Sequence, residues 1–353
     1  MRASIIISTY SISKLKYIIK TIEKCAENDV EFIITVERDK KYFDTLMDKL
    51  KKLKKRINLS AKLILHERRL NLSQARNLGM NFSSGDILIF LDDDVVPAND
   101  CIREIIKTFK ERDDAAIVGS RVELSIPRNI IFPKIFYTLL GGQYVPPNEQ
   151  KILRIRNAVG CALSIKKKII DEIGGFCNFL SFSKSLGAFY GNIGGEDVEI
   201  SKRVWIHYKG HKKVYLNKRA LVYHIISREK MHPWNIFKRS FFLLMIDSIV
   251  NDTLQILCPE NKIACAQEIL NLLEARQLKA ALGELRNTVS LSPKNILELS
   301  IAFLLFLIAQ TGNLLYKTLL KRKFLELIRR NKKYAYNTSF LLKWAKISKI
   351  TTI

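Results

Sequence analysis

The stretch GDILIFLDDDVVP, residues 85–97, decides how this chain is interpreted. It runs through five apolar residues and then places Asp92, Asp93 and Asp94 side by side. Two carboxylates about 4 Å apart repel by roughly 4 kcal/mol at an effective dielectric constant of about 20, and a sheltered cluster relieves this by protonation or by binding a cation. The alternative is a solvated acidic turn in which Asp93 or Asp94 caps a helix that begins near Ala98.

The composition is that of a folded protein with an unusual charge. The chain has 353 residues, of which 48% are hydrophobic and 26% are charged, and 59 Lys and Arg against 34 Asp and Glu give a net charge of +25. This length suits one large domain with an appendage, or two domains. The positive charge favours an anionic partner, whether nucleotide phosphate, nucleic acid or an acidic membrane surface.

Cysteine usage and the N-terminus bear on the compartment. The six cysteines form no Cys-x-x-Cys pair and show no histidine spacing typical of zinc sites. The opening MRASIIISTY enters a strand-like run at once and offers no signal-peptide cleavage site. We therefore expect a reduced, intracellular chain whose first domain lies in the cytosol.

The part of the chain before residue 224 alternates between strand and helix patterns. Strands that are apolar on both faces and separated by helices imply a parallel sheet with helical crossovers. Ligands in such sheets bind beyond the carboxyl ends of the strands, and the three aspartates lie at such an end. The patterns predict strands at 4–8, 30–36, 63–66 and 87–91, and helices at about 15–25, 40–55 and 72–82.

A change of character near residue 225 predicts a domain boundary. A strand is predicted within 157–165, and the helix after it is expected to stop at Gly174 and Gly175. Beyond residue 224 only helical patterns are visible, mostly amphipathic. We predict two regions, 1–224 and 225–353.

Four separated motifs occur in one order: ASIIISTYSISK (3–14), LNLSQARNLGMNFSSGDILIFLDDDVVP (70–97), NAVGCALSIKKKIIDEIGGF (157–176) and GGEDVEISKRVWIHYKGHKKVYLNKRALVYH (194–224). Together they resemble the inverting family 2 glycosyltransferases of the GT-A fold over about residues 3–240. The resemblance implies an α/β fold of the nucleotide-diphospho-sugar transferase type: a Rossmann-like mixed, mainly parallel sheet, followed here by a helical C-terminal region.

The acidic cluster is the predicted metal site. Strand side chains alternate between faces, so Asp92 and Asp94 are expected on one side and Asp93 on the other, unless the strand ends at Leu91 and a turn aims them. Two carboxylates on one side suit a hard divalent cation that also binds a diphosphate. By resemblance, Asp94 coordinates Mn or Mg, Asp92 approaches the metal and the donor's sugar, and His224 reaches the metal or the diphosphate. The alternative is that His224 has a purely structural role.

The donor pocket is predicted from the same resemblance. Thr9 and Tyr10 belong to the nucleotide-binding turn, where Tyr10 stacks on the base, and Arg76 lines the donor pocket. Asp93 is assigned to the donor as well. Glu37 matches an acidic position that meets the base, but Arg38 stands where many relatives have Gly, so the base preference is open. The alternative for Tyr10 is a core or surface tyrosine without a ligand, and the alternative for Arg76 is a solvated helix face.

Glu196 and Asp197 are the predicted catalytic pair. Both open a helix, where acids also complement the positive N-terminal end of the helix dipole, and this is the alternative explanation. By resemblance Asp197 is the general base that takes the proton of the acceptor hydroxyl, with Glu196 as the second candidate. The predicted reaction is a direct displacement at the anomeric carbon with inversion.

The C-terminal region suggests a membrane surface. Residues 299–316 are uncharged, at the lower length limit for a bilayer span, and residues 317–349 carry 11 Lys or Arg and one acid, Glu326. A single crossing from a cytosolic domain would place this basic run outside, against the positive-inside tendency. We therefore prefer attachment at the interface of an anionic membrane on the cytoplasmic face, with a single crossing or a buried helix as alternatives. Such attachment favours a polyprenyl phosphate or another lipid-linked acceptor.

Three other functions are alternatives to this reading of the sequence. A nucleic-acid-binding protein accounts for the charge, but no RNA- or DNA-binding motif occurs and no nucleic acid is expected as a partner. A degenerate transferase kept as a binding or scaffold module is disfavoured because Asp92, Asp94 and Asp197 are all present. A sugar-nucleotide pyrophosphorylase needs a Gly-rich, basic N-terminal loop, which STYSISK is not.

Overall fold

The computed structural model describes residues 1–127, 137, 139–142, 145, 150–180, 194–258, 270–271, 304, 307–339, 341–342 and 345–353. Six residues of the Pro- and Gly-bearing stretch 139–150 and seven residues of the uncharged segment at 299–316 lie outside the described residues, and so do residues 191–193 of the segment that precedes the predicted catalytic pair.

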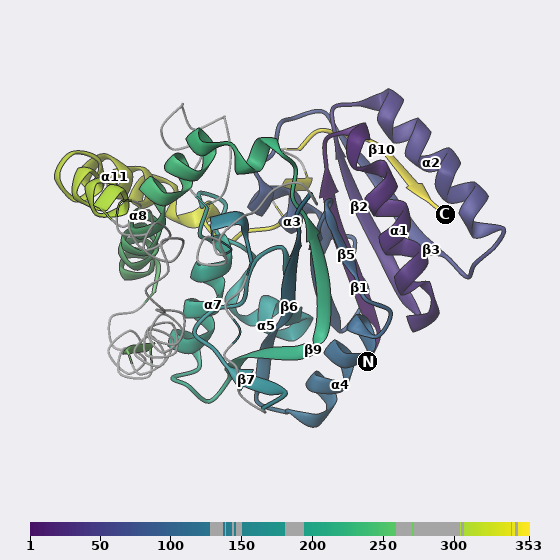
Figure 1. Cartoon of the computed structure of the whole chain (residues 1–353), viewed down its shortest axis with the longest axis horizontal. Helices are drawn as coiled ribbons and strands as arrows, with labels where there is room; N and C mark the ends of the chain where they lie inside the picture. The colour runs from purple at the N-terminus through teal and green to yellow at the C-terminus, as the bar shows by residue number, and fades with distance from the viewer. Residues whose placement is uncertain are drawn as a thin grey trace, which may run out of the picture.

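A ten-stranded mixed sheet forms the middle layer of the protein (Figure 1). Its order is β10-β3-β2-β1-β4-β8-β6-β9-β5, with β7 paired to β9. Strands β3, β2, β1 and β4 run parallel, whereas β8 is antiparallel to both of its neighbours. The strands are β1 (Ala3–Thr9), β2 (Val30–Glu37), β3 (Ser60–His66), β4 (Ile87–Asp92), β5 (Val95–Pro97), β6 (Ala115–Ser125), β7 (Ile152–Arg154), β8 (Ala162–Lys166), β9 (Lys213–Ile225) and β10 (Ile347–Thr352).

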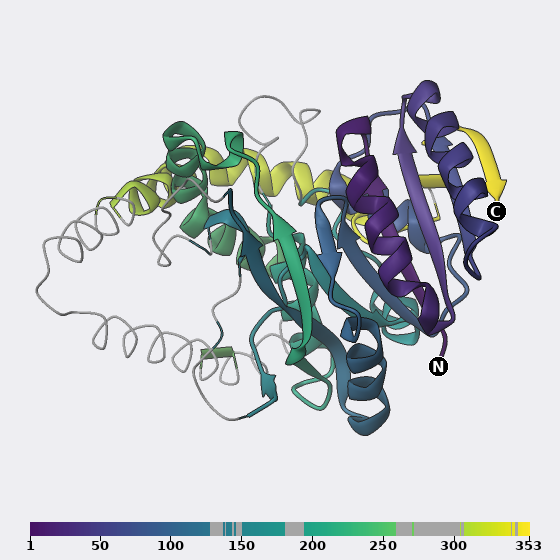
Figure 2. The same cartoon turned by 45° about the vertical axis from the view of Figure 1, so that its right-hand side comes forward.

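Helices cover both faces of this sheet (Figure 2). Consecutive residues of β1 point to opposite faces, so Ile5 and Ile7 join one buried cluster and Ile6 joins the other. The cluster of Ile5 and Ile7 includes side chains of α1 (Leu15–Cys25), α2 (Lys40–Lys54) and α4 (Cys101–Glu111). The cluster of Ile6 includes side chains of α3 (Leu72–Met80), α5 (Lys167–Ile173), α7 (Glu196–His207) and α8 (Pro233–Leu257).

The predicted pattern of the first half is confirmed. The helix predicted at 15–25 is α1, the helix predicted at 40–55 is α2, and each of the four predicted strands lies within β1, β2, β3 or β4. Helix α3 begins with a capping box, in which Asn71 and Gln74 each accept from the other's backbone N–H. Helix α5 ends at Gly174, whose φ of 84° is the left-handed conformation that favours glycine. The helix that the alternative explanation of the acidic turn places near Ala98 is α4, and it begins at Cys101.

The expectation that everything beyond residue 224 is helical is wrong for the last strand. Strand β10 pairs antiparallel with β3 and so forms the edge of the main sheet, at the end far from α8 and α11 (Figure 1). Lys349 of this strand lies 3.0 Å from Asp44 of α2, so the basic run does not form one continuous helix. The pattern ISKITT is short and sits next to a helical region, whereas its pairing partner lies far away in the chain.

The remaining C-terminal elements are helical, as predicted. Helix α11 (Lys321–Asn331) follows the π-helical turn η6 (Tyr316–Leu320), and the 3-10 turn η7 (Lys332–Tyr334) follows α11. Asp252 of α8 holds this segment, because it accepts from Tyr316 at 3.0 Å and lies 2.9 Å from Lys321. On length and composition alone, α8 could cross a membrane, although 38% of its most apolar window is buried inside the protein.

Candidate active site

The carboxyl ends of β1, β2 and β4 meet at one edge of the sheet. Because these strands are parallel and in register, Thr9, Glu37 and Asp92 end neighbouring strands. β4 ends at Asp92, and Asp93 and Asp94 form a tight turn before β5. The turn therefore aims Asp93 and Asp94, and the predicted strand alternation does not extend to them.

Each of the three aspartates has its own set of partners. Asp92 accepts from Arg76, Asp93 accepts from Thr9, and Asp94 faces cationic side chains from other elements. Pairing by β5 with β9 places Val95 opposite His224, which brings the histidine to the turn. The acidic turn is thus a built site whose carboxylates are all held in place, and not a solvated loop.

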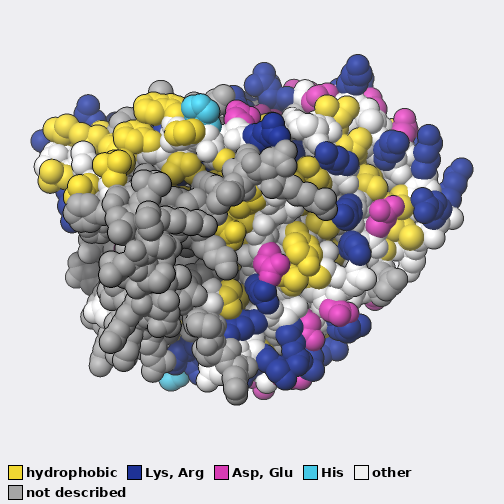
Figure 3. Space-filling model, in the orientation of Figure 1, with side chains coloured by type: hydrophobic (Ala, Val, Ile, Leu, Met, Phe, Trp, Pro, Cys, Tyr) yellow, Lys and Arg dark blue, Asp and Glu magenta, His cyan; other side chains and the backbone are white. Residues whose placement is uncertain are grey.

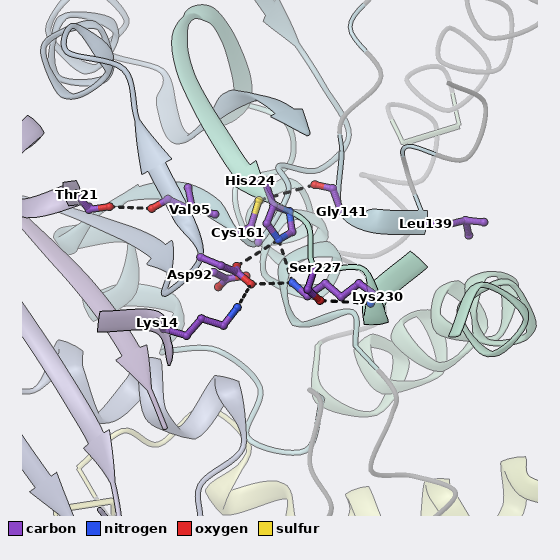
Figure 4. A network of polar contacts seen from close by, with 12 residues as sticks. Lys14, Thr21, Asp92, Val95, Leu139, Gly141, Cys161, His224, Ser227 and Lys230 are labelled. Carbon is purple, nitrogen blue, oxygen red and sulfur yellow. Dashed lines mark hydrogen bonds and ion pairs between the residues drawn. The ribbon is translucent and has the colours of Figure 1, made fainter. Parts of the chain in front are cut away.

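Among the described residues, Asp94 contacts more cationic side chains than the other two aspartates do. Lys14, from the 3-10 turn η1 (Ile12–Lys14), and Lys230, from η5 (Glu229–Met231), both donate to Oδ2 of Asp94 at 2.8 Å. Nε2 of His224 lies 3.3 Å from Oδ1. Figure 4 shows Lys14, His224 and Lys230 converging from different elements. Burial acts to raise the pKa of Asp94, but the His224 hydrogen bond and the Lys230 charge outweigh it and lower the pKa below its ordinary value.

Asp93 points to the first strand. Its Oδ2 accepts from Oγ1 of Thr9 at 2.8 Å, and the same hydroxyl is 3.2 Å from the Tyr42 hydroxyl. Burial and the nearby charge of Asp94 raise the pKa of Asp93 to about 7. The structure therefore brings Thr9 and Asp93 together, as the assignment of both to the donor pocket expects, and their contact with donor stays a prediction.

Arg76 connects the acidic turn to the predicted catalytic pair. Its buried guanidinium donates to Asp92 at 2.8 Å, to Glu196 at 3.1 Å and to the carbonyl of Gly160 at 2.8 Å. Burial acts to lower the pKa of Arg76, but the charges of Asp92 and Glu196 outweigh it and raise the pKa. The solvated helix face is therefore excluded for Arg76. Gly79 lets α3 approach the sheet this closely, since an added Cβ would lie 2.6 Å from the Ile6 side chain.

Glu196 and Asp197 differ in their surroundings. Oε2 of Glu196 is buried and has no hydrogen-bond partner among the described residues, and burial with the charge of Asp197 raises its pKa to about 7. Asp197 is only partly covered, and its carboxylate accepts from the N–H groups of Gly160 at 2.7 Å and Val198 at 2.8 Å. Burial raises the pKa of Asp197, while these backbone hydrogen bonds act to lower it. A base must be reached by its acceptor, and this favours Asp197.

The remaining predicted donor residues lie at the same edge. Tyr10 is 72% exposed directly after β1, so its ring is free to stack on a ligand. Oε2 of Glu37 accepts from the N–H of Leu70 at 3.4 Å, and burial raises the pKa of Glu37. Arg38, where the resemblance expects Gly, has a φ of 57°, a left-handed conformation that favours glycine.

The donor atoms at Asp94 fit a divalent cation that takes further oxygens from elsewhere. A carboxylate and an imidazole nitrogen converge there, and Nδ1 of His224 is buried without a partner in the described part of the chain, so Nδ1 can take the ring proton when Nε2 binds a cation. The described residues contain no group of three or more His, Cys, Asp or Glu side chains that could hold a metal. Asp92 is committed to Arg76, so diphosphate and water would complete the shell.

Sequence reasoning missed several residues of this site. Lys14 and Lys230 contact Asp94. Gly160 accepts from Arg76 and donates to Asp197. The Cys161 thiol lies among the same charges, and burial raises its pKa well above the ordinary value. Lys14 and Cys161 lie inside two of the quoted motifs, but no local pattern points to a lysine against an aspartate 80 positions further on.

A mixed α/β sheet with an acidic turn at the carboxyl ends of its parallel strands defines a glycosyltransferase of the GT-A type. Residues 4–174 match the model of the family described as glycosyl transferase family 2. This segment is therefore a glycosyl transferase family 2 domain.

Two curated relatives and one solved structure agree with this assignment. The chain is 24% identical over 253 residues to a glucosyl-dolichyl phosphate glucuronosyltransferase of Haloferax volcanii, covering 69% of this chain and 75% of the relative. It is 26% identical over 281 residues to an inactive polypeptide N-acetylgalactosaminyltransferase-like protein 5 of Mus musculus, of which it covers 61%. The mannosyltransferase PcManGT of Pyrobaculum calidifontis, solved with GDP-Man and Mn2+, has a similar fold, with a TM-score of 0.53 at 14% identity over 95% of this chain and 88% of that one.

Proposed function

We propose that this protein is a metal-dependent, inverting glycosyltransferase that moves a sugar from a nucleotide-sugar donor to a hydroxyl or phosphate of a lipid-linked acceptor. The observation that carries the proposal is the bridge made by Arg76, which holds Asp92 of the acidic turn and Glu196 of the predicted catalytic pair on one guanidinium. The predicted donor and acceptor sides therefore share one site. The Mn2+ and GDP-Man bound to PcManGT support a nucleotide-sugar donor and a divalent cation.

Different residues of the site have different roles in the proposed reaction. A divalent cation bound at Asp94 and His224 would stabilise the negative charge of the departing nucleoside diphosphate. Thr9, Tyr10, Glu37 and Asp93 lie along the edge where the nucleoside is expected. Asp197, at the start of α7 and open to the site, takes the proton of the attacking acceptor. Arg76 fixes the distance between these two halves by ion pairs to both.

The lipid-linked acceptor is supported by the name of the Haloferax relative and by an exposed aromatic pair. Trp234 and Phe237 begin α8 and are 56% and 37% exposed, with their rings stacked 5.2 Å apart. Both follow Lys230, which reaches Asp94, so they lie close in the chain to the site. Figure 3 shows hydrophobic side chains gathered over the α8 and α11 end of the molecule, with Lys and Arg around them. Aromatic and basic side chains in this combination suit an anionic membrane interface.

The experiment is a transfer assay with the purified chain. Uridine and guanosine diphosphate sugars are offered one by one with Mn2+ or Mg2+, with and without a polyprenyl phosphate in detergent, and product is followed by mass spectrometry. Transfer that needs the metal and the lipid phosphate supports the proposal. Asp197→Asn and Asp94→Ala should lower turnover by about 10²–10⁴-fold while circular dichroism stays unchanged. Failure of all donors to react, or full activity in either variant, contradicts it.

A further inference from the structure

Two lysines from distant parts of the chain occupy one oxygen of Asp94. Nζ of Lys14 and Nζ of Lys230 each lie 2.8 Å from Oδ2, whereas Nε2 of His224 lies 3.3 Å from Oδ1. The Asp94 side chain is 6% exposed, whereas those of Lys14 and Lys230 are 21% and 28% exposed. The carboxylate is thus buried beneath two ammonium groups that remain in contact with solvent.

These lysines give the site an excess of positive charge. Asp92 is already paired with Arg76, and Asp94 faces Lys14 and Lys230. Arg239 of α8 is near enough for the charge of Asp94 to act on it. Two ammonium groups therefore contact Asp94, and the charge of a third cation, Arg239, acts on it from α8. An anion would balance the positive charge around Asp94.

The same lysines stand where a cation on Asp94 would have to bind. Two unit charges 4 Å apart repel by about 4 kcal/mol at an effective dielectric constant of about 20. A metal ion and two ammonium groups at the same carboxylate oxygen would therefore repel one another strongly. Their long side chains are anchored in short 3-10 turns, η1 and η5, and each can leave Asp94 for an oxygen of a neighbouring phosphate.

We propose that Lys14 and Lys230 hold the cation position on Asp94 in the free enzyme and move to the diphosphate of the donor when donor and metal bind together. Metal alone then binds weakly, because it must displace the lysines without a phosphate to receive them. The lysines make metal and donor binding mutually dependent. The inference rests on the proposed function for the identity of the anion, but its tests measure binding and not sugar transfer.

The first test is Mn2+ binding without donor, measured by electron paramagnetic resonance on the full chain. Lys14→Met and Lys230→Met should each lower the Kd for Mn2+ about fivefold or more, because one competing charge is removed. Lys230→Arg keeps the charge and should stay within about twofold of the wild type. Lys24→Met is the matched control. Lys24 lies on α1, the helix that follows Lys14, and among the described residues it bonds only to Asn99, at 2.6 Å. Unchanged or weaker Mn2+ binding in both Met variants overturns the proposal.

The second test is binding of inorganic pyrophosphate without metal, measured by calorimetry. The wild type should bind it, and Lys14→Met and Lys230→Met should each weaken binding about fivefold or more, because a charge-assisted contact is lost. Equal affinity in wild type and both variants overturns the proposal. The two lysines lie on different elements, so each variant is an independent test if the other fails to fold. A chain that passes both tests but transfers no sugar keeps this inference and loses the proposed function.

Discussion

Arg76 and Glu196 lie 120 positions apart in the chain, and Nη1 of Arg76 is 3.1 Å from Oε1 of Glu196. The other terminal nitrogen of the same guanidinium holds Asp92 at 2.8 Å. One side chain from α3 thereby sets the spacing between the acidic turn and the start of α7.

Replacing Arg76 should damage both stability and catalysis. Arg76→Met leaves Asp92 and Glu196 without their shared counter-ion, which should cost about 3 kcal/mol of unfolding free energy. The displaced carboxylates should lower turnover about a hundredfold or more. Denaturant unfolding and the transfer assay measure the two effects. Arg103→Met removes an exposed pair with Asp100 and serves as control. Wild-type turnover in Arg76→Met would show that the bridge has no part in the reaction.

The pKa of Glu196 predicts a pH-dependent stability. Its folded pKa is about 7, above the ordinary value of 4.5, so the folded state keeps this proton longer than the unfolded state as the pH rises. The wild type should therefore lose stability between about pH 5 and pH 7 relative to Glu196→Gln, on the order of 1–3 kcal/mol, since one pKa unit is worth 1.36 kcal/mol. Thermal melts of both proteins at several pH values measure this. A difference in Tm that stays constant with pH would contradict the raised pKa.

Gly160 leaves little room for a side chain beside the proposed base. A Cβ there would lie 3.2 Å from Cβ and Oδ2 of Asp197, tighter than ordinary contact, so Gly160→Ala should push the carboxylate out of position. We expect kcat to fall about tenfold or more while the KM for the donor changes little. Steady-state kinetics separate the two parameters. A variant with unchanged kcat would argue against Asp197 as the base.

Strand β10 offers a matched pair of substitutions. Ile353 and Ala61 exchange two backbone hydrogen bonds, of 2.7 and 3.1 Å, so alternation along the antiparallel pair places the N–H of Thr351 on Leu63 and that of Thr352 away from β3. Thr351→Pro should therefore lower the Tm by several degrees more than Thr352→Pro. Equal effects would mean that the ladder between β10 and β3 adds little stability.

The aromatic pair on α8 should determine lipid binding. Trp234→Ser and Phe237→Ser should each reduce binding to vesicles that contain anionic lipid, measured by co-sedimentation, because each removes a large apolar ring from the interface. Ile350→Ser, exposed on β10 at the other end of the sheet, is the control. If the aromatic variants bind vesicles as the wild type does, this surface does not attach the protein. Substitutions are preferable to deleting residues 290–353, because that deletion also removes β10.

The amino-acid sequence determined the elements of the first half and the place of the acidic turn. Both are local properties: β1, α1, α2 and β4 follow from the spacing of apolar residues, and the aspartates follow the end of a buried strand. The family resemblance of the four motifs also indicated Arg76, Glu196 and Asp197 as site residues. It did not indicate that Arg76 contacts both the acidic turn and Glu196.

Only the tertiary structure decided which side chains meet. Lys14 and Lys230 reach Asp94 across 80 and 136 positions, and β10 pairs with β3 across nearly the whole chain. The strand alternation predicted for Asp92 and Asp94 stops where β4 ends, because a turn and not a pleat orients the following residues. Such contacts depend on the path of the chain and on charge neutralisation inside the fold, and neither leaves a periodic signal in a short stretch of residues.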